Sequence, residues 1–283
     1  MKKVKIITDS TCDLSKELVE KYNIAVTPLF VNFGEESYQD GVSIDVEKMY
    51  KLVEEKNMLP KTAAQSPGNF AELFKKYLDE GYEIVYMGIG SKFSATLSSA
   101  NVAKQTLESE DIYLVDSLNL SSGTGLLVLK AATLAQKGLS AKEIKQEIEN
   151  LVPNVRSQFV IDTLEYLYKG GRLNALSNFF GSMLKIKPII KVRDGLMAVG
   201  KKGRGSMKKG IDLMLAEVFA EKENIDPEFM MITHSLADEQ VLYIRERIKQ
   251  ENLEVENLHE TQAGCVISSH CGKGTIGVLY ILK

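Results

Sequence analysis

The chain has 283 residues, which suits two domains of about 100–150 residues each. Its net charge of −3 argues against a general nucleic-acid-binding protein, and three cysteines are too few for a disulfide framework. No stretch has the pattern of a signal peptide or a membrane span, so we expect a soluble, cytoplasmic protein.

Short β-branched runs alternate with amphipathic stretches in the first half of the chain. Strands are predicted at residues 4–7, 25–33, 84–87 and 112–115. Helices are predicted at residues 14–22, 46–55, 70–78, 96–107, 125–136 and 140–150, the last opened by Ser140 and Glu143 at capping-box spacing. Strands separated by helices indicate βαβ crossovers and a mainly parallel sheet.

The second half has a different pattern. Strands are predicted at residues 157–160, 188–192, 196–199, 230–233, 253–258 and 275–282, and helices at 207–219 and 238–250. Arg193-Asp194-Gly195 is a hairpin signal. We therefore expect an α/β domain over residues 1–153 and an α+β domain over 154–283.

Adjacent His270 and Cys271 raise the question of a metal site. Structural zinc needs four ligands, usually in close pairs, and Cys265 and Cys271 do not have that spacing. Gly272-Lys273-Gly274 resembles the end of a phosphate loop, but a strand pattern follows it where a phosphate loop needs a helix. We predict neither a metal nor a nucleotide cofactor.

Hydroxyl side chains form a further constellation. Thr62 is predicted in a loop after a helix, and Ser94 and Thr96 follow a predicted strand, at the edge of an α/β sheet where ligands bind. The start of the next helix favours an anion there. A turn that only caps its own helix is the alternative.

A basic stretch lies in the second half. Residues 185–209 contain nine Lys or Arg and one acid, Asp194. This pattern fits a solvated face, a nucleic-acid patch, or a dock for an acidic or phosphate-bearing partner. No aromatic residues interleave with it to support binding of single-stranded nucleic acid, so we predict no nucleic-acid partner.

Six motifs in order resemble those of the DegV family. They are IITDSTCDL, KTAAQS, GSKFSATLSSA, VDSLNLSSGTG, YLYKGGRL and GCVISSHCGKGTIGV. The family comprises bacterial fatty acid-binding proteins that serve as the lipid-binding component of fatty acid kinase. The resemblance implies an α/β domain with a parallel sheet and an α+β domain with a mostly antiparallel sheet. It also implies a fatty acid site between the two domains and a role in phospholipid metabolism. A separate ATP-dependent kinase subunit would form the acyl phosphate, and lipid exchange would involve transient membrane contact.

The resemblance also assigns site residues. It places the fatty acid carboxylate on Thr62, Ser94 and His270, the last in a terminal loop, with Thr96 and Lys273 nearby. Arginines at the positions of Arg172 and Arg204 are implicated in engaging the kinase. Apolar residues expected along the acyl chain are Phe159, Leu164, Phe179, Phe180, Met183, Leu184 and Ile186.

The chain departs from the family pattern at three places. Ala63-Ala64-Gln65 replaces Ser-Gln-Pro, Ala95 replaces a glycine beside Phe93, and Lys273 replaces a proline. The first two changes are expected to alter the shape of the pocket. An acyl-ester or acyl-phosphate hydrolase or transferase that uses Ser94 or Thr62 with His270 is the alternative function, although no nucleophile-elbow motif is present.

Overall fold

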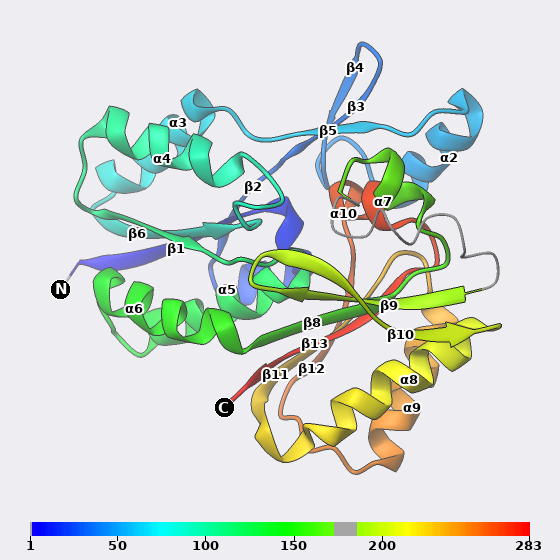
Figure 1. Cartoon of the computed structure of the whole chain (residues 1–283). Coiled ribbons are helices and arrows are strands. Elements are labelled where there is room, and N and C mark those ends of the chain that lie inside the picture. Colours follow the sequence, from blue (N-terminus) through cyan, green and yellow to red (C-terminus); the bar gives the residue numbers. More distant parts are fainter. Residues whose placement is uncertain (1, 173–185) are drawn as a thin grey trace.

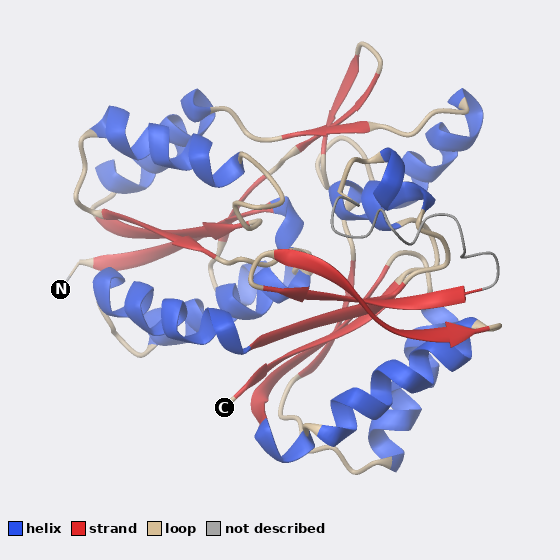
Figure 2. Ribbon diagram, viewed as in Figure 1, coloured by secondary structure: helices blue, strands red, loops and turns tan. Residues whose placement is uncertain are grey.

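A four-stranded parallel sheet forms one layer of the molecule. The structure, a computed structural model, describes residues 2–172 and 186–283. The strand order is β2 (Ala25–Thr27), β1 (Lys3–Asp9), β6 (Tyr82–Gly88), β7 (Ile112–Asp116). Helices cover both faces of this sheet (Figure 2). They are α1 (Lys16–Lys21), α3 (Pro67–Asp79), α4 (Thr96–Leu107), α5 (Ser122–Gln136) and α6 (Ala141–Leu151).

A six-stranded sheet forms the second layer. Its order is β10 (Leu196–Arg204), β9 (Ile186–Arg193), β8 (Val155–Val160), β13 (Ile276–Leu282), β11 (Ile225–His234), β12 (Leu258–Gln262). All neighbours are antiparallel except β11 and β12. Helices α8 (Met207–Ala220) and α9 (Asp238–Gln250) cover its outer face (Figure 1). The predicted fold class, a parallel sheet followed by a mostly antiparallel one, is confirmed.

A small antiparallel sheet lies beside these layers. It consists of β4 (Glu36–Gln39), β3 (Phe30–Phe33) and β5 (Lys61–Ala63). Helices α2 (Val46–Lys56) and α10 (Cys265–Cys271) share a hydrophobic cluster with it, and α7 (Glu165–Lys169) adds Tyr166. Short 3-10 turns are formed by Ser10–Cys12, Val152–Asn154 and Lys222–Asn224.

Helix α5 joins the two large sheets into one core. Its buried residues include Leu126, Leu127 and Leu129, and they pack in one cluster with Val85 of β6 and Met231 of β11. The expected division at residue 153 separates the strands of the two sheets along the chain, but this cluster crosses it. The division into two domains stays a prediction.

Local signals account for several elements. The capping box of Ser140 and Glu143 is present, and Asp194 and Gly195 form the β9–β10 turn with φ of +51° and +72°.

The single strand predicted at 25–33 is wrong. Strand β2 joins the parallel sheet and β3 the small sheet, because Pro28 between them cannot donate a backbone hydrogen bond. The strand predicted at 253–258 is also wrong, since β12 begins at Leu258.

Candidate functional site

A cavity of about 280 Å³ lies where the three sheets meet. Small-molecule sites usually measure about 300–1,000 Å³, so its volume is just below that range. Most side chains on its wall are apolar, among them Leu29, Ile89, Phe93, Leu120, Phe159, Leu167, Met197, Val266, Ile267 and Leu279. Thr62, Ser94, Arg172 and His270 also line the cavity, so it brings together residues more than 200 positions apart in the sequence.

Thr62 and His270 are in direct contact. Thr62 Oγ1 lies 3.0 Å from His270 Nε2, and both side chains are partly buried. Thr62 was expected in a loop, but it lies in β5, whose pairing with β3 through Val31 fixes its position. The expected pair of carboxylate-binding residues is thus adjacent in space, with one hydroxyl and one imidazole facing the same cavity.

His270 does not lie in a loop, as the sequence suggested, but in the last turn of α10. Two buried carboxylates from the N-terminal part of the chain hold the first turn of this helix. Asp40 accepts the backbone N–H of Cys265 at 2.7 Å, and Asp13 accepts that of Gly264 at 2.8 Å. Burial raises the pKa of both carboxyls. These distant side chains satisfy N–H groups that have no partner within the helix, which local sequence cannot reveal.

Burial and a neighbouring cation keep the imidazole of His270 neutral. Burial is the larger cause and Arg172 the smaller, and together they lower the pKa of His270 to about 4. Arg172 is exposed at the cavity wall, where its Nη1 donates to the carbonyl of Gly170 at 2.6 Å. The buried His270 Nδ1 has no hydrogen-bond partner among the described residues. Gly170 packs so closely that a Cβ there would lie 2.2 Å from Nδ1.

Ser94 lies in the segment between β6 and α4, as expected. Its Oγ is 2.8 Å from Oγ1 of Thr96 and accepts the Thr96 backbone N–H at 3.3 Å. Thr96 is fully buried behind it and is not among the cavity-lining residues, and exposed Lys273 is also outside that set. Ser94 therefore offers a hydroxyl to the cavity, while Thr96 fixes its orientation.

Other hydroxyls on the wall are bonded within the protein. Ser157 donates to Oδ1 of Asn119 at 2.7 Å, and Ser121 donates to Asp13 at 2.5 Å. The buried hydroxyl of Thr233 is hydrogen-bonded to those of Ser122 and Thr261, and the hydroxyl of Ser235 is hydrogen-bonded to those of Tyr50 and Ser268. Because these groups already have partners, they leave most of the wall effectively apolar. Polar groups suited to a ligand are concentrated around Thr62, Ser94, Arg172 and His270.

The residues expected along an acyl chain have different locations. Phe159 of β8 lines the cavity. Leu164 is buried in a cluster with Ile161 and Leu167, and neither it nor Ile186 is a lining residue. Phe179, Phe180, Met183 and Leu184 lie outside the described residues, and the side chain of Arg204 is not described either.

Sequence reasoning missed other parts of the wall. Ser157 of β8, two residues before the expected Phe159, and Gly277 and Leu279 of β13 face the cavity at a spacing of two. This alternation is the signal that a strand gives. Leu120 and Met197 come from a loop and from β10, and their sequence neighbourhoods give no comparable signal.

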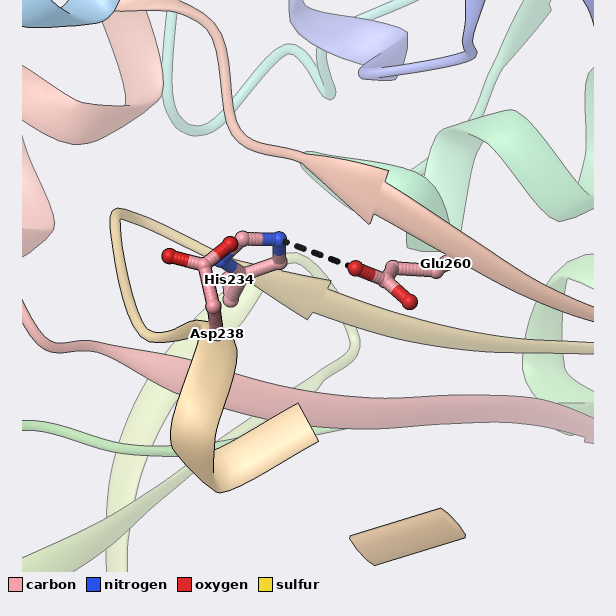
Figure 3. A group of neighbouring side chains, drawn as sticks. All are labelled: His234, Asp238 and Glu260. Carbon is pink, nitrogen blue, oxygen red and sulfur yellow. Dashed lines mark ion pairs between the residues drawn. The ribbon is translucent and has the colours of Figure 1, made fainter. Parts of the chain in front are cut away.

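His234, Asp238 and Glu260 form a group of possible metal ligands, drawn in Figure 3, with atoms within 4.8 Å of one another. The imidazole geometry argues against a metal. His234 Nδ1 accepts the backbone N–H of Ala237 at 3.0 Å, so a neutral ring carries its proton on Nε2. That atom faces Glu260 Oε1 at 3.7 Å, and a metal would require it to be unprotonated.

Comparison with known proteins gives one family. The model of the DegV family, described as "Uncharacterised protein", matches residues 3–283. A DegV domain-containing protein of Clostridium acetobutylicum is 40% identical over 283 residues, which cover 100% of both chains.

Two solved structures are similar over nearly their whole length. A fatty acid-binding DegV family protein from Thermus thermophilus has a TM-score of 0.93 and 29% identity, covering 99% of this chain and 100% of that one. A stearic acid-binding protein from Eubacterium ventriosum has a TM-score of 0.89 and 27% identity, with 99% and 98% covered.

Proposed function

The chain belongs to the DegV family, and from this premise we propose that it binds a long-chain fatty acid in the cavity described above. In this proposal Thr62, Ser94 and His270 hold the carboxylate, and the apolar wall surrounds the acyl chain. Its support comes from the fatty acid-binding structures to which the chain is similar and from the distribution of polar groups in the cavity.

The observation that carries the proposal is the contact of Thr62 with His270 at one side of a largely apolar cavity. A carboxylate taken from water needs several hydrogen bonds. The hydroxyls of Thr62 and Ser94 can each donate one, and Nε2–H of neutral His270 can donate another. Arg172 adds a permanent positive charge at the same wall.

The apolar wall supplies most of the affinity. About fifteen methylenes at ~0.8 kcal/mol each give roughly 12 kcal/mol of gross transfer free energy. Loss of translational and rotational freedom offsets part of that sum. Phe93 and Phe159 come from different layers of the fold and meet in one hydrophobic cluster, where an acyl chain would contact both.

Two features favour binding over acyl hydrolysis. Thr62 and His270 have the distance of a nucleophile and its base, but a pKa of about 4 makes His270 a weak base at neutral pH. Its Nδ1 also has no carboxylate partner among the described residues, so an imidazolium formed during catalysis would not be stabilised. Incubation with an acyl ester and with acyl phosphate is therefore expected to give no turnover by the protein alone.

The finer part of the proposal is presentation of the carboxylate to a separate kinase. Arg172 is exposed and lines the cavity, so it can contact both the ligand and a docked partner. Arg204 at the end of β10 is proposed as a second contact. The protein would collect its ligand by transient membrane contact in the cytoplasm. Among the described residues, no helix has the length and apolar character needed to span a bilayer.

Mass spectrometry of lipid extracted from the purified protein tests the binding proposal. A long-chain fatty acid at about one equivalent is expected. Protein that carries no fatty acid and also takes none up after delipidation would refute the proposal.

A matched pair of variants tests the carboxylate site. Thr62→Val removes one hydroxyl and is expected to lower the affinity for a fatty acid about tenfold or more. The affinity for a long-chain alcohol, which has no carboxylate, is expected to fall less. Thr106→Val makes the same change on the exposed surface of α4 and is the control. Equal affinities of both variants for fatty acid would show that Thr62 does not hold the carboxylate.

Kinase presentation needs its own test. Arg172→Ala is expected to lower the rate of ATP-dependent acyl phosphate formation with a fatty acid kinase subunit, even when the variant is saturated with fatty acid. Arg245→Ala, on α9, is the control. An unchanged rate in the Arg172 variant would exclude this arginine from presentation and leave the binding proposal untouched.

A further inference from the structure

A second cavity lies on the opposite face of strand β8. It has a volume of about 250 Å³ and is lined by residues of β8, β9, β13 and the last turn of α8. Along β8, Phe159 lines the first cavity, Arg156 and Gln158 line the second, and Ser157 between them contributes to both. Helix α8 covers this outer face of the six-stranded sheet (Figure 1).

This second cavity contains buried polar groups that lack hydrogen-bond partners in the described part of the chain. Gln158 is only 4% exposed, and its Nε2 has no hydrogen-bond partner among the described residues. Nε of Arg156 is likewise buried and without a partner there. The guanidinium is fixed, because Nη1 donates to the carbonyls of Pro153 at 2.9 Å and Val155 at 3.3 Å. Buried donors without partners are costly in a fold, so their presence together calls for an acceptor.

The charges on the wall favour an anion. Three cationic side chains (Arg156, Lys191 and Arg193) and two acidic ones (Glu217 and Glu221) line the cavity, so the formal net charge of its wall is +1. Both acids already face a protein group, although Glu217 Oε2 accepts no hydrogen bond among the described residues. Glu217 Oε2 lies 2.6 Å from Lys191 Nζ, and Glu221 accepts the hydroxyl of a tyrosine on β13 at 2.5 Å. Arginine offers a planar set of donors that matches phosphate and carboxylate groups.

We propose that this cavity binds a small oxyanion, a metabolite that carries a phosphate or several carboxylates. Arg156 and Gln158 donate to it from the floor, and Arg193 donates from the rim. The site is separate from the fatty acid cavity and does not rest on the proposed function. Since the two cavities occupy opposite faces of one strand, a fatty acid and an oxyanion can be bound at the same time.

Titration calorimetry on the purified protein tests this proposal. Inorganic phosphate and citrate are the two probes, with sodium chloride at matched ionic strength as the reference. Saturable binding of one equivalent of either probe is expected, and the tighter of the two distinguishes a phosphate from a carboxylate ligand. Absence of saturable binding of both probes at millimolar concentrations would overturn the proposal.

Variants locate the binding. Gln158→Leu keeps the size of the side chain and removes the donor, and Arg156→Gln removes the guanidinium. Each is expected to weaken oxyanion binding about tenfold while the bound lipid stays at its normal level. Arg193→Gln changes an exposed side chain, so it tests the same site even if the buried variants do not fold. Arg245→Gln on α9 is the control, and a loss of affinity equal to that of the pocket variants would assign the binding to nonspecific surface charge.

Discussion

The histidine of the proposed carboxylate site should make the stability of the delipidated protein depend on pH. His270 has a pKa of about 4 in the folded protein against 6.5 for an unperturbed histidine. A depressed folded pKa stabilises the fold above the unfolded pKa, and that contribution is lost as the pH falls from 6.5 toward 4. At pH 5 the unfolded histidine is mostly protonated and the folded one is not, which removes about 2 kcal/mol of unfolding free energy relative to pH 7.

The variant His270→Gln isolates this effect. Glutamine retains a donor for Thr62 and does not titrate. Between pH 7 and pH 5, the loss of unfolding free energy should therefore be about 2 kcal/mol smaller in the variant than in the wild type. The buried carboxyls of Asp13 and Asp40 have raised pKa values and act in the opposite direction, but both proteins contain them. Urea unfolding followed by circular dichroism at the two pH values measures the difference.

Nuclear magnetic resonance gives an independent check, because the chain has only three histidines. One imidazole resonance should titrate near pH 4 and be missing from the His270→Gln spectrum. Parallel pH profiles of wild type and variant, together with a His270 resonance that titrates near 6.5, would refute the assignment of a buried, neutral imidazole.

Three further substitutions have defined outcomes. Gly170→Ala places a Cβ 2.2 Å from Nδ1 of His270 and should lower the affinity for fatty acid at least tenfold. Gly68→Ala is the control, because its Cβ would lie 3.9 Å from the nearest atom and should leave the affinity unchanged. Calorimetry with a fatty acid measures both affinities. Asp40→Asn replaces an acceptor of backbone N–H groups at the start of α10 and should reduce the unfolding free energy by about 1–3 kcal/mol, so an unchanged denaturation midpoint would contradict the role of this carboxylate. Gly123→Ala meets two side-chain oxygens at 2.2 Å and should destabilise the protein by about 1–3 kcal/mol in thermal unfolding, and a variant as stable as wild type would show that this contact relaxes freely.

Sequence periodicity predicts the elements whose stability is mainly local. Helices α4 and α9 have the predicted bounds, and the hairpin turn at Asp194 and Gly195 is present because its residues tolerate positive φ. Helix α10 was not predicted. Its sequence, CVISSHC, has β-branched and hydroxyl residues of low helix propensity, and its first turn depends on Asp40, which lies 225 residues away.

The same limit applies to the site. Thr62, Ser94 and His270 were identified through resemblance to a family, and all three line the cavity. Their motifs alone argued against a metal and a phosphate loop, but they left open a hydrolase and a turn that only caps its own helix. The lowered pKa of His270 depends on burial and on Arg172, and the contact of Thr62 with His270 depends on tertiary structure, so neither can be calculated from spacing along the chain.

Helix α5 has a consequence for how the molecule folds. Ten of its fifteen residues are buried, and they complete the cores of both large sheets. Neither half of the chain can lose its structure without exposing the leucines on which the other half packs. We therefore expect one cooperative unfolding transition, with the backbone amides of α5 among the last to exchange hydrogen with solvent. Under the proposed function, a fatty acid would then enter by local opening at the cavity mouth, since a wide separation of the two sheets would amount to unfolding.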